Sequence, residues 1–122
     1  MNIDLNQVLL NDNGKELQEK VGTELKSITL RQVLLGTLRS SLEGDAKLSF
    51  TEKENLFDLL MKLNKDQDVE FAAAEITVLQ KRVQQMNYGI LLCVQVCRLL
   101  DKKETGIVKE EEAADESKPT PE

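Results

Sequence analysis

The sequence predicts a mainly α-helical fold, a small bundle of about four helices, and three observations support that prediction. Apolar residues recur every three or four positions in four separate stretches, as expected for helices that bury one face. Two of the stretches open with a capping-box pattern, Thr29 to Gln32 and Thr51 to Glu54. Aromatic residues make up only 3% of the chain and Trp is absent, so the core has to be aliphatic.

A short N-terminal arm precedes the helices. Residues 3–10 are rich in aliphatic side chains and lead to Asn13-Gly14, a strong turn signal because both residue types tolerate positive φ. In residues 15–27 the apolar positions are mixed with Gly22 and with charged residues. We therefore expect an extended segment, a turn, and a return strand or irregular connection.

The first helix is predicted from Thr29, as its N-terminal cap, to a stop at Gly44. Its apolar stripe consists of Leu30, Val33, Leu34, Leu38 and Leu42. Gly36 inside this helix costs about 1 kcal/mol relative to alanine. That glycine is either tolerated for close helix packing or forms the floor of a groove for a partner helix.

The second helix is predicted to start at Thr51, with Phe50 folded back on Asn55 or Leu56. It carries a wide apolar face made of Leu56, Phe57, Leu59, Leu60, Met61 and Leu63, and it ends in the polar run 64–68. Val69-Glu70-Phe71 alternates for three residues and could pair with the N-terminal segment as a small edge bridge.

The third helix is predicted over residues 72–86, with one apolar stripe formed by Ile76, Leu79, Val83 and Met86. Its outer face is expected to consist of Lys81, Arg82, Gln84 and Gln85. The fourth helix follows a break at residues 87–89 and runs to Leu100.

The fourth helix is apolar nearly all round, and only Gln95 and Arg98 interrupt its surface. Such a helix is either the centre of the bundle or buries a second face against another subunit. We expect one face to leave Leu91, Leu92 or Leu99 uncovered, and therefore predict a homo-oligomer formed through this helix.

The charge of the chain is concentrated at its C-terminal end. The net charge is −6, and residues 101–122 carry eight acids and four bases. Residues 1–102 are predicted as one helical domain with its arm, and residues 103–122 as a disordered acidic tail. The tail is either a solubility tail or a docking segment for a basic partner. Neither part has the basic face that direct nucleic-acid binding usually needs.

No secretory signal or membrane span is predicted, because the start of the chain has no basic region and the longest apolar run, residues 89–94, is far too short. A soluble cytoplasmic protein is therefore expected. Cys93 and Cys97 are expected to be buried, reduced thiols, since two donors without a histidine cannot complete a zinc site.

The sequence contains no pattern typical of an enzyme. With no histidine, a nucleophilic triad lacks its base, and the six glycines are too scattered to form a phosphate-binding loop. Asp66, Asp68 and Glu70 are spaced like calcium ligands, but the loop has no central glycine and Thr77 stands where the closing glutamate should be. We predict no catalytic, cofactor-binding or metal-binding residues.

Several short motifs resemble a group of small proteins encoded by tailed phages and prophages. They are the opening Met1 to Leu5, the Asn13-Gly14 turn, the helix entry Ile28-Thr29-Leu30, the step Val69-Glu70-Phe71 and the pair Glu75-Ile76. The chain departs from the group in its Cys-bearing last helix, its long 15–27 connection and its acidic tail. The resemblance implies a phage origin, which would place the protein in the host cytoplasm, and it implies no particular activity.

Together these patterns predict a non-enzymatic protein–protein interaction module, acting in virion assembly or as an adaptor. The alternative is an acidic inhibitor that occupies a basic site on a host nucleic-acid-binding or defence protein.

Overall fold

The computed structural model describes residues 2–65 and 69–107, which form a mainly helical fold with two small sheets. The elements in chain order are β1 (Asn2–Ile3), β2 (Gln18–Val21), β3 (Glu24–Ser27), α1 (Leu30–Arg39), the 3-10 turn η1 (Asp45–Lys47), α2 (Phe50–Leu63), β4 (Val69–Glu70), α3 (Ala73–Gln85) and α4 (Ile90–Leu100). The four expected helices are present in this part of the chain, but the fold is not purely helical, because two two-stranded antiparallel sheets accompany them.

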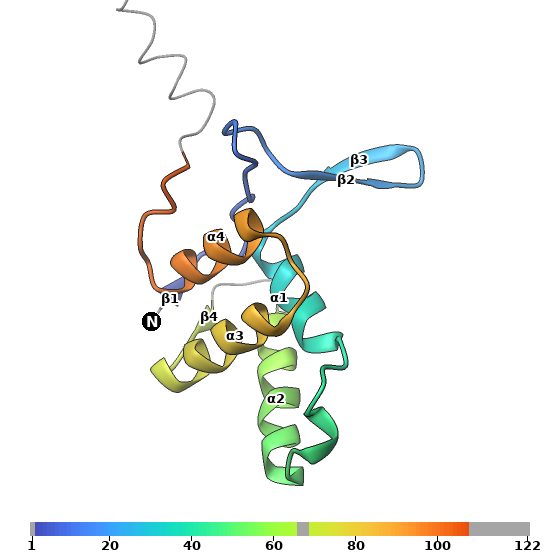
Figure 1. The fold of residues 1–122 in the computed structure, drawn as a ribbon, viewed down its shortest axis with the longest axis vertical. Helices are drawn as coiled ribbons and strands as arrows, with labels where there is room; N and C mark the ends of the chain where they lie inside the picture. The colour runs from blue at the N-terminus through green and yellow to red at the C-terminus, as the bar shows by residue number, and fades with distance from the viewer. Residues whose placement is uncertain (1, 66–68, 108–122) are drawn as a thin grey trace, which may run out of the picture.

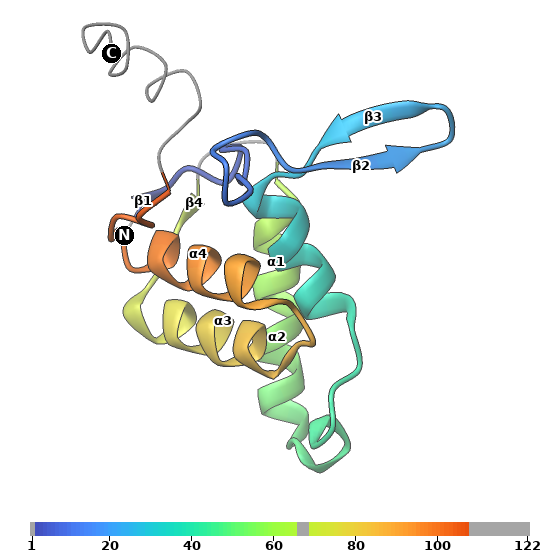
Figure 2. The ribbon, with the colours of Figure 1, turned by 45° about the horizontal axis from the view of Figure 1, so that its top comes forward.

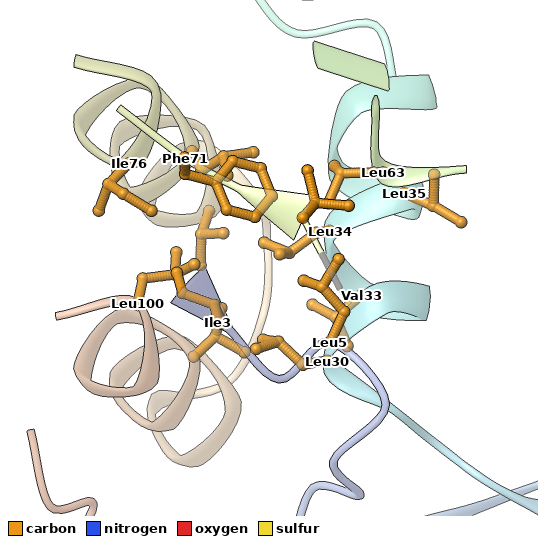
Figure 3. Close-up of a cluster of buried hydrophobic side chains, with 14 of the residues drawn as sticks. Ile3, Leu5, Leu30, Val33, Leu34, Leu35, Leu63, Phe71, Ile76 and Leu100 are labelled. Atoms are coloured by element: carbon orange, nitrogen blue, oxygen red, sulfur yellow. The ribbon is translucent and has the colours of Figure 1, made fainter. Parts of the chain in front are cut away.

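The helices pack around one aliphatic core. α3 and α4 lie side by side, α1 contacts both α2 and α3, and the N-terminal segment crosses near α4 (Figures 1 and 2). Figure 3 shows side chains from both sides of the bundle converging on a single cluster. Phe71 is the one aromatic side chain buried there, at 1% exposure.

The start of α1 is the one the sequence predicts. The Thr29 hydroxyl accepts from the backbone N–H of Gln32, and the Gln32 side chain accepts from the backbone N–H of Thr29. The helix ends at Arg39, however, and not at Gly44. Gly44 instead adopts φ +98° and precedes the 3-10 turn, so it lies within the connection between α1 and α2.

The predicted start of α2 is wrong by two residues. The cap is Ser49, whose hydroxyl accepts from the backbone N–H of Glu52 at 3.1 Å, while the Glu52 carboxylate accepts from the backbone N–H of Ser49 at 3.0 Å. Thr51 and Glu54 fit the same sequence pattern, but both lie inside the helix and are exposed. The two overlapping boxes are equivalent in sequence, and the chain uses the earlier one.

Arg82 is buried, which corrects its predicted place on the outer face of the third helix. Its guanidinium donates to both carboxylate oxygens of Asp45, at 3.0 and 3.2 Å, and to the backbone carbonyl of Ser40. The Arg82 hydrogen bond and the backbone N–H of Leu42 hold the pKa of the Asp45 carboxyl below its usual value. This ion pair ties α3 to the connection between α1 and α2.

Gln95 is also buried, although the sequence suggested a polar point on the surface of the fourth helix. Its side-chain oxygen accepts from the Leu10 backbone N–H at 2.8 Å, and its side-chain nitrogen donates to the Leu10 carbonyl at 2.9 Å. The amide therefore pairs with Leu10 as a neighbouring strand would. Together with the confirmed pairing of β1 and β4, in which Ile3 faces Val69, it holds the N-terminal segment against the helices.

A pair of hydroxyl groups connects the α3–α4 link to α1. The Tyr88 hydroxyl lies 3.0 Å from that of Thr37 and donates to the Val33 carbonyl at 3.4 Å. Thr37 is fully buried, and its hydroxyl donates to the same carbonyl. The break predicted at residues 87–89 is thus a docked link between two helices.

Candidate interaction surface

The β2–β3 hairpin extends away from the helical body, and it is the most prominent surface feature of the molecule (Figures 1 and 2). Its strands pair antiparallel, with Gln18 opposite Ser27 and Val21 opposite Glu24. The two-residue connection begins at Gly22, whose φ of +66° is the left-handed conformation that such tight turns require.

The base of the hairpin is fixed to the core by three backbone hydrogen bonds. Leu9 donates to Ile28, Leu17 donates to Leu9 and Ile28 donates to Leu17, with distances of 2.9, 2.8 and 2.8 Å. Leu9 is fully buried, and Leu17 and Ile28 pack against the core cluster. The base is therefore rigidly placed, while the strands beyond it are not packed on the body.

The strands themselves are solvated on both faces. All four residues of β2 and the first three of β3 are exposed, and Leu25 keeps 66% of its surface in contact with solvent. No further strand of the described chain pairs with either edge. An isolated two-stranded hairpin is only marginally stable in water, so a third strand or another surface would stabilise it.

Sequence patterns did not locate this hairpin within the 15–27 connection. Each strand contains a single apolar residue, Val21 in β2 and Leu25 in β3, so the apolar alternation that usually signals a strand is missing. The available signal was Gly22-Thr23 as a two-residue loop between two four-residue segments. The earlier Asn13-Gly14 turn does form, with Gly14 donating to Asn11, but it is closed only by a single bridge between Leu10 and Glu16.

A second exposed surface lies on α2. Phe50, Phe57 and Met61 keep 74%, 58% and 42% of their surface exposed, and their spacing places them along one line of the helix. The buried residues of this helix, Leu59 and Leu63, lie on the opposite side. The wide apolar face predicted for the second helix is therefore two faces, of which only one packs on the core.

The fourth helix is covered differently from the prediction. Leu92 and Leu99, which we expected to lack cover, pack against the core cluster, and Leu91 is partly buried. Ile90, at 85% exposed, and Val94, at 39%, are the large apolar residues that α4 leaves in solvent.

Cys93 and Cys97 are free thiols, as expected, but they are only partly buried, which corrects the expectation of buried side chains. They line an open pocket of about 250 Å³ between α3 and α4, together with Gln84, Val94, Arg98, Asp101 and Lys103. Burial raises the pKa of the Cys97 thiol, whose hydrogen is directed at the Gln80 carbonyl. Such a thiol is less reactive than an exposed one.

Neither a metal site nor a membrane span is found in the described chain. Across residues 2–65 and 69–107, no group of three or more acidic or cysteine side chains is placed to hold a metal ion. Of the residues with calcium-like spacing, Asp66 and Asp68 lie outside the described residues. No helix in the same ranges is long and apolar enough to cross a membrane.

The C-terminal segment can be followed for a short distance after α4. Lys103 donates from its backbone to the Arg98 carbonyl, and the Arg98 guanidinium donates to the Thr105 carbonyl. Residues 108–122, most of the predicted acidic tail, lie outside the described residues.

Comparisons of the chain with protein-family models, with curated proteins and with solved structures gave no match.

Proposed function

We propose that this protein is a non-enzymatic protein–protein interaction module that binds an extended segment of a partner through the β2–β3 hairpin. The observation that carries the proposal is a hairpin with a rigid base and two open edges. An open edge offers a row of backbone N–H and C=O groups, which an incoming strand can pair with. Strand addition also supplies the third strand that an isolated hairpin lacks.

A role in virion assembly or as an adaptor forms part of the same proposal, and the resemblance to small phage proteins supports the phage origin that this role assumes. Self-association through α4, which the sequence predicts, remains a prediction. Its contact residues would be Ile90 and Val94, since those are the large apolar side chains that α4 leaves exposed.

The test is a shortened hairpin that preserves the base. Deleting residues 18–21 and 24–27 joins Leu17 through Gly22-Thr23 to Ile28, which moves the same two-residue turn onto the last pair of the ladder. The pair of Leu17 and Ile28 has the same hydrogen-bonding phase as Val21 and Glu24, so the turn is transplanted without a change of register. The melting temperature should change little, because the deleted residues bury almost no apolar surface.

The wild type, the shortened variant and a Phe57→Glu variant would be used as baits in lysate of the native host. We expect the shortened bait to lose the proteins that the wild type captures, and the α2 variant to keep them. Capture of the same proteins by the wild-type and shortened baits would refute the hairpin as the interaction element.

A further inference from the structure

We propose that the open edge of β3 pairs antiparallel with the same edge of a second copy of this chain. The two-fold axis passes through Leu25, and the two hairpins form one four-stranded sheet. The inference rests on the proposed use of the hairpin for strand addition, and it names a partner for one of the two edges.

The hydrogen-bonding pattern of β3 leaves the backbone N–H and C=O groups of Leu25 and Ser27 on its open edge. The Ile28 N–H donates to the Leu17 carbonyl, so this position of the ladder is turned inward. Hydrogen-bonded and non-hydrogen-bonded pairs alternate along an antiparallel ladder. Lys26 and Glu24 are therefore also turned inward, and the N–H and C=O groups of Leu25 and Ser27 face the open edge.

The side chains of β3 are complementary to themselves around Leu25. An axis at this residue lets Leu25 exchange two backbone hydrogen bonds with the partner's Leu25 and places the two exposed leucines together. It also sets Glu24 opposite the partner's Lys26, and Lys26 opposite the partner's Glu24. These are the closely spaced, non-hydrogen-bonded positions, where opposite charges stabilise a sheet.

The charges continue in alternation across the whole sheet. Lys26 already faces Glu19 within its own hairpin. In the paired form, the side chains that lie next to one another across one face of the sheet are therefore Glu19, Lys26 and the partner's Glu24. No two like charges are adjacent in this row. On the other face, the two Leu25 side chains lie between the stems of the Lys20 side chains, which can cover apolar surface while their charged ends stay in water.

Alternative self-pairings bring like charges together. Moving the axis on β3 by one residue places Lys26 against the partner's Lys26, or Glu24 against the partner's Glu24. On β2 an axis at either middle residue opposes Lys20 to Lys20 or Glu19 to Glu19. Like charges directly opposite each other are destabilising, so the Leu25 axis on β3 is favoured over these four alternatives.

The contact is short, so the dimer belongs to the weak and transient class of interfaces. Analytical ultracentrifugation of the full chain up to about 1 mM covers the range of such complexes. We expect a reversible monomer–dimer equilibrium. A wild type that remains monomeric over this range would overturn the inference, whereas the proposed function would fail only if the shortened hairpin captured the same partners.

Charge reversal tests the register. Glu24→Lys and Lys26→Glu each place like charges at both outer pairs, and each should weaken the dimer by about tenfold. An equal mixture of the two variants restores opposite charges at both pairs, so a heterodimer should form with near wild-type affinity. A mixture that associates no better than the separate variants would contradict the Leu25 axis.

Two proline variants test which edge is used. Leu25→Pro and Lys20→Pro each remove an N–H that faces an open edge, one from each strand, and neither N–H belongs to the hairpin's own ladder. We expect Leu25→Pro to abolish dimerisation and Lys20→Pro to leave it intact. Loss in both variants, or in Lys20→Pro alone, would refute pairing through β3.

Discussion

The hydrogen bonds between Gln95 and Leu10 give the sharpest stability prediction. Gln95→Ala removes both partners of a buried backbone N–H and C=O, at an amide that is 3% exposed. An unsatisfied buried backbone group costs about 1–3 kcal/mol. Two such groups give an expected loss of about 2–6 kcal/mol in the free energy of unfolding, a large fraction of the stability of a small domain.

Gln95→Glu separates the hydrogen bonds from the packing, because glutamate has nearly the same shape as glutamine. An ionised carboxylate can accept from the Leu10 N–H but cannot donate to the Leu10 carbonyl. A protonated one can do both. Burial raises the pKa of this new carboxyl above its unfolded value of about 4.3. A raised pKa means that the folded state holds its proton more tightly, so the variant loses stability as the pH rises from about 4.3 through the folded pKa.

Urea unfolding of the wild type and both variants at pH 5 and pH 8 measures these effects. We expect Gln95→Glu to be closer to the wild type at pH 5 than at pH 8, and Gln95→Ala to be destabilised similarly at both. The exposed Gln85→Ala is the control and should change stability by less than about 0.5 kcal/mol. A Gln95→Ala variant as stable as this control would refute the assigned role of the amide.

Three further predictions concern local features, each tested by thermal or urea unfolding. Ser49→Ala should lower the free energy of unfolding by about 1 kcal/mol by removing the cap of α2, whereas Thr51→Ala should lower it far less. Equal losses in the two variants would contradict the assignment of Ser49 as the cap. Gly36→Ala should stabilise by about 0.5–1 kcal/mol, because the added methyl carbon meets its nearest neighbour at an ordinary 3.9 Å. Gly22→Ala should destabilise, since φ is +66° there, and stabilisation at both glycines would contradict this reasoning. Asp45→Asn should cost about 2 kcal/mol near neutral pH by leaving a buried guanidinium without its anion. Because the folded pKa of Asp45 is lowered, the stabilisation by its carboxylate is complete above the ordinary pKa of 3.8 and disappears as the pH falls through the folded pKa. The stabilities of the variant and the wild type should therefore converge in acid. A difference in stability that stays constant down to low pH would show that the loss does not come from the Asp45–Arg82 ion pair.

The helices could be predicted from sequence because their signals are local. The cap at Thr29 and the stripe of Ile76, Leu79 and Val83 depend on residues a few positions apart, and the structure confirms both. The Val69–Glu70 pairing was also anticipated, since a short alternating segment next to a helix has few other places to dock.

The errors arose where distant residues decide the outcome. Arg82 and Gln95 resemble surface residues in a helical pattern, but their partners lie 37 and 85 positions away in the chain. An excess of apolar residues in a helix indicates that it has apolar surface on more than one side, but it does not say which helix leaves such surface exposed to solvent. Leu92 and Leu99 of the fourth helix pack against the core, while Phe57 on α2 is exposed.

The link between α3 and α4 provides a built-in optical reporter. The chain contains a single tyrosine and no tryptophan, so Tyr88 alone accounts for its near-ultraviolet tyrosine emission. The hydroxyl of this ring is hydrogen-bonded to Thr37 and Val33, and its fluorescence is therefore expected to report on the docking of the link on α1. Tyrosine fluorescence of the unmodified chain can therefore time the docking of the α3–α4 link on α1 during folding.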